Sequence, residues 1–309
     1  MNDSPNIGSI GIIGIGAMGM GMARNLHRKG FAVCVQDIRR DAGAEAMAAG
    51  ITVCDSPAAL ASIASLIVLV VVDAAQIDDV LFGAGGVVPG TVAGKGKTVM
   101  ICSTIAPEDT QRFGRQLAEH GIDLIDAPIS GGPARADDGS MSMMLAAPNA
   151  TLAPWQSVLT ALAAKQFRIS ERTGDGARAK LVNNLLAGIN LVAGAEALGL
   201  GIQLGLEPHQ LYDLIVASSG QSWIMTDRMG RALQDDYAPR AAAHILTKDM
   251  TLATAMAAVA GYATPLGEAA LARYRQTIER GWSALDDAAV LRTYLEPDLA
   301  PGPVKADLP

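Results

Sequence analysis

Lys180 and Asn184 are polar residues in a stretch that is otherwise apolar nearly all the way round, "GDGARAKLVNNLLAGINLVAGAEALGLG", and that predicts one long helix. Their spacing of four residues places both side chains on one face of that helix. An ammonium group can donate a proton and, once deprotonated, accept one, and burial in apolar surroundings lowers the pKa of a lysine. Such a pair suits the proton transfer that accompanies hydride transfer at a carbonyl. Alternatively, Lys180 extends to solvent from the first turns of the helix.

A second constellation is glycine-rich and follows the apolar stretch "SIGIIGIG". It has the spacing GxGxxG, and its residues are Gly14, Gly16, Ala17, Met18 and Gly19. The pattern opens a helix, and a further strand ends at Asp37, where a ribose-binding carboxylate is expected in a dinucleotide site. The helix N-terminus would then face the pyrophosphate. Asp37 favours NAD over NADP, although Arg39 and Arg40 nearby could receive a 2′-phosphate or simply begin the next helix as exposed charges.

These residues need a scaffold, and the chain divides into two parts that could supply it. Residues 1–172 alternate β-branched runs with Ala-rich helical stretches, which predicts a Rossmann-type, doubly wound parallel sheet. Residues 173–296 lose the strand signal and predict an all-α domain that begins with the long interdomain helix, which would present Lys180 to a cleft. Residues 297–309 form a Pro-rich, flexible tail.

Composition excludes several classes of function. The chain has 309 residues, half of them hydrophobic, and a net charge of −7, which argues against nucleic acid as a partner. Three scattered cysteines suit a reducing cytoplasm, and neither they nor the four histidines have a metal-ligand spacing. The N-terminus lacks the pattern of a signal peptide, and the longest uninterrupted apolar run, Leu66 to Val72, is too short to span a bilayer.

Several motifs together resemble the β-hydroxyacid dehydrogenase family, which includes 3-hydroxyisobutyrate dehydrogenase. They are "GIIGIGAMGMGMARNL", "CSTIAPEDT", "DAPISGGPARADDGSMSMM", "GDGARAKLVNN" and "TKDMTLA", in matching order over almost the whole chain. The resemblance implies that Lys180 is the catalytic lysine, with Asn184 beside it. It also implies a substrate-carboxylate loop and further cofactor contacts, which are Ser130, Gly131 and Gly132 for the loop and Val72, Gln76, Thr104 and Lys248 for the cofactor.

Some of these implied roles compete with simpler interpretations. Gln76 stands where relatives often have Asn, and the chain lacks the proline that many relatives carry in the turn at Val72. Thr104 could cap the helix that begins near Pro107 as well as contact the cofactor. Lys248 and Asp249 would ordinarily be a surface ion pair. Trp223 could pack in a core or form a substrate-binding lid over the nicotinamide.

The leading expectation is an NAD-dependent dehydrogenase, with NADP possible, acting on a short hydroxy acid, most readily a four-carbon sugar acid such as L-threonate. The enzyme alternatives are 3-hydroxyisobutyrate dehydrogenase and a reductase of tartronate or succinic semialdehyde. A different class is an NAD(P)-binding regulatory protein without catalysis, which would bind cofactor without turnover. We also expect no membrane association, and a homodimer or homotetramer formed through residues 174 to 296.

Overall fold

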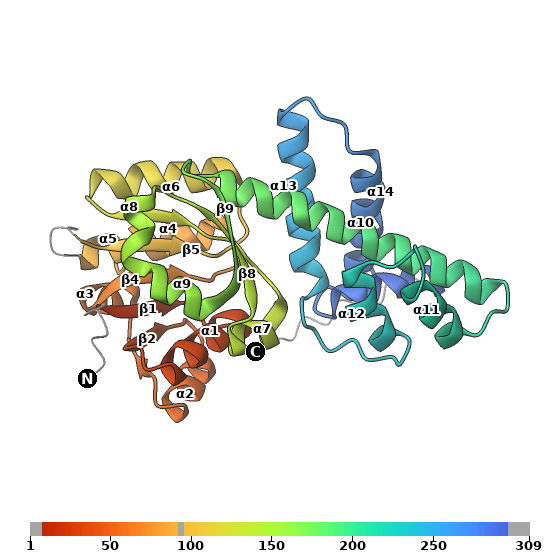
Figure 1. The fold of residues 1–309 in the computed structure, drawn as a ribbon, viewed down its shortest axis with the longest axis horizontal. Helices are drawn as coiled ribbons and strands as arrows, with labels where there is room; N and C mark the ends of the chain where they lie inside the picture. The colour runs from red at the N-terminus through yellow and green to blue at the C-terminus, as the bar shows by residue number, and fades with distance from the viewer. Residues whose placement is uncertain (1–7, 92–95, 296–309) are drawn as a thin grey trace. The chain divides into compact units, whose positions relative to one another are not determined.

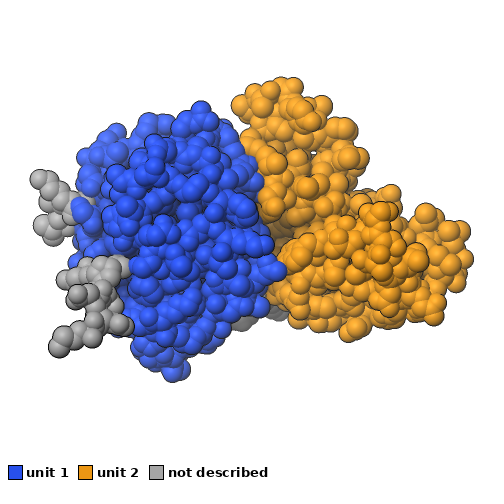
Figure 2. All heavy atoms as spheres, in the orientation of Figure 1, with its two compact units in different colours: residues 1–180 blue, residues 181–309 orange. Residues whose placement is uncertain are grey.

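The computed structural model describes residues 8–91 and 96–295. Its contacts divide the chain into unit 1, residues 1–180, and unit 2, residues 181–309 (Figure 2). The dividing point is a few residues beyond the boundary that the change in composition suggests near residue 173. The reason is that α10, Asp175–Gln203, is a single helix whose first turns pack in unit 1 and whose later turns pack in unit 2. The predicted tail lies outside the described residues.

Unit 1 is built on one nine-stranded sheet (Figure 1). The strands are β1 Ser9–Ile13, β2 Val33–Gln36, β3 Thr52–Val53, β4 Ala64–Leu69, β5 Thr98–Ile101, β6 Asp123–Asp126, β7 Ile129–Ser130, β8 Met141–Ala146 and β9 Ala163–Ser170. Their order is β3-β2-β1-β4-β5-β6-β8-β7, with β9 paired to β8. Strands β1 to β6 are parallel, whereas β8 is antiparallel to β6 and β7. The predicted Rossmann-type sheet is confirmed, with an antiparallel edge that the sequence did not predict.

The central strands are apolar on both faces because helices cover both faces of the sheet. In β4, Leu66 and Val68 pack into one core cluster while Ile67 and Leu69 pack into the other, and all four are fully buried. The covering segments are α1 Ala17–Arg28, α2 Arg40–Ala48, α3 Pro57–Ile63, α4 Ala74–Phe82, α5 Val87–Gly90, α6 Pro107–Glu119, α7 Gly132–Asp138, α8 Asn149–Leu152, η1 Ala153–Trp155 and α9 Gln156–Leu162. Successive strands are added on one side of β1 up to β3 and on its other side from β4 onward, and doubly wound sheets bind ligands at this change between β1 and β4.

Unit 2 is all-α over the residues described, as predicted. After α10 come α11 Pro208–Val216, α12 Trp223–Ala232, α13 Ala243–Val259, α14 Pro265–Glu279, η2 Asp287–Leu291 and α15 Arg292–Leu295. Its core gathers apolar side chains from α10, α12, α13, α14 and η2 around the fully buried Tyr274. Glycines along α10 allow close packing, since a Cβ on Gly188 would lie 2.3 Å from the sulfur of Met250.

Helix α10 is long and apolar enough to cross a membrane by length and composition, with a mean hydropathy of 1.7 over its most apolar window. The core helix of a globular protein passes the same test. Here Leu191, Ala195 and Leu198 of α10 lie in the core cluster of unit 2, so packing within the protein explains the apolar composition of these turns.

Candidate active site

The glycine motif forms a tight turn at the carboxyl end of β1. Gly14 has a φ of +86°, and a Cβ there would lie 2.6 Å from the carbonyl oxygen of Val70. A Cβ on Gly19 would lie 2.0 Å from the carbonyl oxygen of Gly14, so only glycine lets α1 begin this close to the strand. Gly16 is the N-cap of α1, has no capping side chain, and has nothing within 4 Å of its ideal Cβ position. This turn fits a pyrophosphate, because it leaves main-chain N–H groups and open space at a positive helix end.

Asp37 lies next to this turn, just after β2, and several donors fix its carboxylate. Oδ2 accepts from the backbone N–H of Ile15 at 2.8 Å, and Oδ1 accepts from the backbone N–H of Arg39 at 2.9 Å. The guanidinium of Arg39 lies 3.3 Å from Oδ1 and also donates to the carbonyl of Ile15. Arg39 is therefore not simply an exposed charge at a helix start. A cavity of about 390 Å³ opens from Gly16 and Ala17 toward α2 and α7, and Arg39 lines it.

The turns that follow β4 and β5 join the glycine turn along the same edge of the sheet. The backbone N–H of Val70 donates to Ile13, and that of Val71 donates to the Ser103 hydroxyl at 3.1 Å. Gln76 folds back so that its Oε1 accepts from the backbone N–H of Val72 at 2.9 Å. Asp73 caps α4 by accepting from the N–H of Gln76. This capped turn contains no proline, and its main chain is held by the side chains of Asp73 and Gln76.

Thr104 follows β5 at this edge, but the alternative role considered for it is wrong. The N-cap of α6 is Ala106, which supplies no side-chain bond, so neither Ser103 nor Thr104 is the N-cap residue of that helix. Ser103 instead holds the turn after β4. The structure therefore gathers Gly14–Gly19, Val72, Gln76 and Thr104 along neighbouring strand ends of unit 1.

The Ser130–Gly132 loop begins at the last residue of β7 and leads directly into α7, whose first residue is Gly132. Gly131 and Gly132 have φ angles of +141° and +77°, and Gly131 is the N-cap of α7 without a capping side chain. Successive main-chain N–H groups in such a conformation can turn toward an anion. The loop is compatible with the predicted role in receiving a substrate carboxylate.

Lys180 lies in the second turn of α10 and is buried, with 7% of its surface exposed. The start of α10 is attached to β6 through Asp126, a buried residue whose Oδ2 accepts from the backbone N–H groups of Gly174 and Gly176 at 2.8 and 2.9 Å. Burial raises the pKa of Asp126 to about 6, while these main-chain bonds oppose the rise.

Asn184 and Lys248 meet at one carboxylate in unit 2. Asp249 is buried, and its Oδ2 accepts from the Asn184 amide at 2.7 Å while its Oδ1 pairs with the Lys248 ammonium at 2.7 Å. The amide oxygen of Asn184 accepts from Asn183. The expectation of an ordinary surface pair at Lys248 and Asp249 is therefore wrong, because the pair connects α13 to the helix that carries Lys180.

Trp223 is the first residue of α12, and it is half-exposed rather than packed in the core of unit 2. It lines a cavity of about 550 Å³ within that unit, together with Tyr212, Arg231 and Arg240. Core packing as its main role is therefore excluded within the described fold. The lid role stays a prediction.

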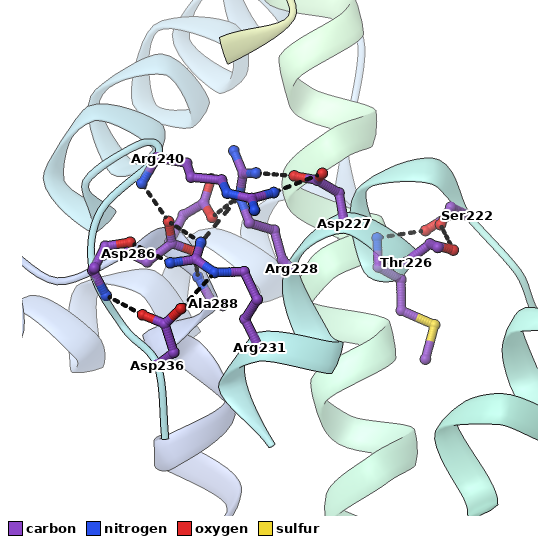
Figure 3. Close-up of polar contacts among 12 residues, drawn as sticks. Ser222, Thr226, Asp227, Arg228, Arg231, Asp236, Arg240, Asp286 and Ala288 are labelled. Carbon is purple, nitrogen blue, oxygen red and sulfur yellow. Dashed lines mark hydrogen bonds and ion pairs between the residues drawn. The ribbon is translucent and has the colours of Figure 1, made fainter. Parts of the chain in front are cut away.

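Beside this cavity lies an ion cluster that the sequence did not predict (Figure 3). Arg228 is buried, and its Nε lies 2.9 Å from Asp287 and 3.5 Å from Asp286, with Asp227 as a further partner. Arg240 donates its backbone N–H to Asp286 and its guanidinium to Asp227. Burial raises the pKa of Asp287 to about 7, against the opposing charge of Arg228. These contacts attach α12 to Asp287, the first residue of η2, and to Asp286 just before it.

Sequence reasoning missed four residues that position the candidate site, namely Asp73, Ser103, Asp126 and Asp249. Asp73 had a local signal, since it stands three residues before Gln76 at a helix start. The other three contact residues at least 32 positions away, so no local pattern could reveal them. Within residues 8–91 and 96–295, no group of three His, Cys, Asp or Glu side chains gathers as a metal ion would require.

The strand order and the glycine turn define a dinucleotide-binding oxidoreductase, and comparisons with known proteins agree. Residues 9–170 match the NAD-binding domain of 6-phosphogluconate dehydrogenase, and residues 174–294 match the NAD-binding domain of NADP-dependent 3-hydroxyisobutyrate dehydrogenase. An L-threonate dehydrogenase from Cupriavidus necator is 38% identical over 286 residues, covering 93% of this chain and 96% of its own. One from Escherichia coli is 35% identical over 292 residues, covering 92% and 94%.

Among solved structures, a 3-hydroxyisobutyrate dehydrogenase from Salmonella typhimurium superimposes with a TM-score of 0.86 at 34% identity. It covers 92% of this chain and 99% of its own. The chain therefore belongs to the β-hydroxyacid dehydrogenase family, whose members include 3-hydroxyisobutyrate dehydrogenase and L-threonate dehydrogenase. It is an NAD-binding enzyme that oxidises a CH–OH group of a hydroxy acid.

Proposed function

We propose that this enzyme oxidises a four-carbon sugar acid such as L-threonate, with Lys180 as the proton-transfer group. The observation that carries the lysine assignment is its burial, 7% exposed, on the same helix as Asn184 one turn later. A lysine that extended to solvent would not be buried to this degree. The substrate class is supported by the L-threonate dehydrogenases at 34–38% identity over most of the chain.

Each group has a separate task in this proposal. The Ser130–Gly132 loop receives the substrate carboxylate through main-chain N–H groups at the start of α7. Lys180 accepts the proton of the reacting hydroxyl as the C–H bond breaks, and donates it back in the reduction. Asn184, held by Asp249, keeps one orientation on the same helix face. The bound NAD supplies the hydride acceptor.

The test of the lysine assignment compares Lys180→Ala and Lys180→Arg in steady-state assays of NADH formation. We expect kcat to fall about 10²–10⁴-fold in both, the usual range for a positioned acid–base group. Arginine fails because a guanidinium stays protonated. NAD affinity should be nearly unchanged, because the glycine turn lies in another segment. Lys165→Ala, at an exposed lysine, is the matched control and should keep the wild-type kcat. A near-normal kcat in Lys180→Arg would refute the assignment of Lys180 as the proton-transfer group.

The substrate assignment is tested with a panel of L-threonate, D-threonate, 3-hydroxyisobutyrate, glycerate and 4-hydroxybutyrate. The highest kcat/KM should fall on L-threonate. A preference for 3-hydroxyisobutyrate would favour a 3-hydroxyisobutyrate dehydrogenase. A preference for glycerate would favour a tartronate semialdehyde reductase, and a preference for 4-hydroxybutyrate a succinic semialdehyde reductase. Cofactor binding without turnover across the panel would favour a regulatory protein.

We also propose that unit 2 forms at least a homodimer. Helix α11 has no buried residue, and neighbouring apolar side chains are largely exposed, among them Leu200, Leu204, Leu206 and Leu214. Contiguous apolar surface of this kind marks association sites. Sedimentation at micromolar concentration should give a dimer or larger species, and Leu204→Lys should shift it toward monomer. A wild-type protein that sediments only as a monomer would exclude this assembly.

A further inference from the structure

Asp126 is a buried carboxylate to which the reaction assigns no role. It is the last residue of β6 and is 1% exposed. Its Oδ2 accepts three backbone N–H groups at the start of α10, from Gly174 at 2.8 Å, Gly176 at 2.9 Å and Ala177 at 3.3 Å. The first N–H groups of a helix lack partners within the helix. A side chain from a distant strand therefore caps the helix that carries Lys180.

The helix has a local carboxylate that could have served as its cap, yet that group has other partners. Asp175 pairs with Arg172 and Arg178 at 3.0 and 2.5 Å and accepts from the Ser170 hydroxyl at 2.7 Å. The capping task falls to β6 instead. A local cap would stabilise α10 equally well but would not fix the distance between α10 and the sheet.

The arrangement carries a cost that a purely structural cap would avoid. Oδ1 of Asp126 is buried and has no hydrogen-bond partner among the described residues. Burial raises the pKa of Asp126 to about 6, and the neighbouring negative charge of Asp175 adds to the rise. The charge of Asp126 in turn contributes to the raised pKa of the buried Cys102 thiol. The neutral carboxyl is thus favoured by the fold. Because the pKa of Asp126 is higher in the folded protein than in the unfolded chain, binding a proton there adds to the free energy of unfolding. This contribution is complete below the unfolded pKa of about 4 and is lost as pH rises through about 6.

Asp126 is close in sequence to one segment of the proposed site and is hydrogen-bonded to the start of the helix that carries the other. The chain that leaves Asp126 reaches Ser130 four residues later, and the helix that begins at its N–H partners reaches Lys180 three residues beyond Ala177. We propose that Asp126 is a positioning residue whose ionised side chain sets Lys180 relative to the Ser130–Gly132 loop. This proposal rests on the proposed function of Lys180.

Gly176 makes the close approach possible and supplies an independent way to disturb it. A Cβ on Gly176 would lie 2.8 Å from Oδ1 and 2.9 Å from Cγ of Asp126. Gly176→Ala would therefore displace the carboxylate from the helix start, although alanine is the better helix former. Any loss of activity in that variant would come from displacement rather than from a weaker helix.

The first experiment measures kcat, KM, NAD affinity and melting temperature for Asp126→Asn. We expect kcat to fall about 10- to 100-fold, because a small misplacement of a reacting group costs this much. NAD affinity should be unchanged, and the melting temperature should stay within a few degrees, because asparagine removes the buried charge and can still place its amide oxygen at the start of α10. Gly176→Ala should reproduce the fall in kcat. Asp123→Asn, at the exposed start of the same strand, is the matched control and should behave as wild type.

The pH profile separates positioning from a general structural role. Oδ2 faces three donors, so protonation occurs on Oδ1 and weakens the bonds to α10. In the reduction direction, where protonated Lys180 is the donor, the wild-type kcat should fall as pH drops through about 6, a limb that Asp126→Asn should lack. Asp126→Asn with a lower melting temperature, unchanged kcat and an unchanged acid limb would overturn the proposal in favour of a structural cap.

The closing experiment introduces Asp126→Asn into the Lys180→Ala enzyme. If Asp126 acts through Lys180, the second change should not lower the residual rate further. An additional fall by the same factor as in wild type would overturn the positioning role while leaving the lysine assignment intact. Full activity of Lys180→Ala itself would instead refute the proposed function, and the positioning role with it. The two failures are thus distinguishable.

Discussion

Asp126 in unit 1 and Asp287 in unit 2 are both buried carboxylates whose pKa burial raises, to about 6 and about 7, but different groups compensate their charges. Asp126 is held by three main-chain N–H groups. Asp287 is held by the guanidinium of Arg228, which also lies 3.5 Å from Asp286. Main-chain donors carry only partial charge and are lost only on substitution by proline, whereas a guanidinium is a full charge that any replacement by a neutral residue removes.

Because their partners differ, the buried carboxylates of Asp126 and Asp287 have different consequences for the protein. The main-chain bonds of Asp126 fix where a helix begins relative to a strand, which is a matter of geometry. The ion cluster of unit 2 attaches α12 to the start of η2 and so contributes to stability (Figure 3). Substitution of Asp126 in unit 1 should therefore mainly lower activity, whereas substitutions in the ion cluster of unit 2 should mainly lower the free energy of unfolding.

The largest expected effect is on stability, in Arg228→Leu. Removal of this guanidinium leaves Asp286 and Asp287 buried without a charged partner of comparable burial, and breaking a buried pair costs about 3–5 kcal/mol. The free energy of unfolding, measured in urea, reports this loss. Arg240→Leu is the matched control, because its guanidinium is half-exposed and should contribute less than about 1 kcal/mol.

A second substitution shows whether uncompensated charge causes the loss. Asp287→Asn added to Arg228→Leu removes one of the orphaned carboxylates, so the double variant should be more stable than Arg228→Leu alone. Equal or lower stability of the double variant would mean that packing rather than charge dominates in this cluster, and the contrast with Asp126 would fail.

An intermediate effect tests the main-chain side of the comparison at the glycine turn. In Gly19→Ala the new methyl group would meet the carbonyl of Gly14, so the turn must shift, at a cost of about 1–3 kcal/mol in stability together with a loss of NAD affinity. Gly16→Ala meets nothing within 4 Å in the protein, so stability should hold while NAD affinity falls. Thermal melting and fluorescence titration with NAD measure both. Equal melting temperatures for the two variants would contradict this account of Gly19.

The same contrast explains what could be predicted from the sequence. Main-chain geometry leaves a local signal, because the turn at Gly14 needs a positive φ and the strands of a doubly wound sheet need runs such as Leu66 to Val72. The Rossmann-type sheet of unit 1 and the all-α fold of unit 2 were accordingly predictable. Strand β9 was missed because much of it is exposed, so its residues lack the apolar pattern of the central strands.

Side-chain contacts between distant segments left no such signal. Arg228 and Asp287 are 59 positions apart, and Asn184 and Asp249 are 65 positions apart. Asp249 looked like half of a surface pair because its sequence neighbour is a lysine, and only folding shows that a second helix buries it. Lys180 became a candidate because a lysine in an apolar helix is unusual and because the motif around it resembles that of the family, whereas Asp126 ends an ordinary strand.

The smallest expected effect concerns Asp37, which combines both kinds of partner. Its carboxylate accepts two main-chain N–H groups, from Ile15 and Arg39, and also pairs with the Arg39 guanidinium. The main-chain bonds fix the carboxylate where it would repel a 2′-phosphate, while the guanidinium offsets part of that repulsion. We therefore expect NAD to be preferred, with a margin that depends on both groups.

Two substitutions should move this preference in opposite directions. Asp37→Asn removes the charge and keeps an acceptor oxygen for only one of the two main-chain N–H groups, and should raise kcat/KM for NADP relative to NAD about tenfold, equivalent to about 1.4 kcal/mol. Arg39→Met removes an exposed guanidinium, and should lower the same ratio by up to about fivefold, since exposed pairs are worth at most about 1 kcal/mol. The measurement is kcat/KM with each cofactor at fixed ionic strength. A wild-type preference for NADP, abolished by Arg39→Met, would show that the side chain outweighs the main-chain-held carboxylate, and would reverse the contrast drawn for unit 1.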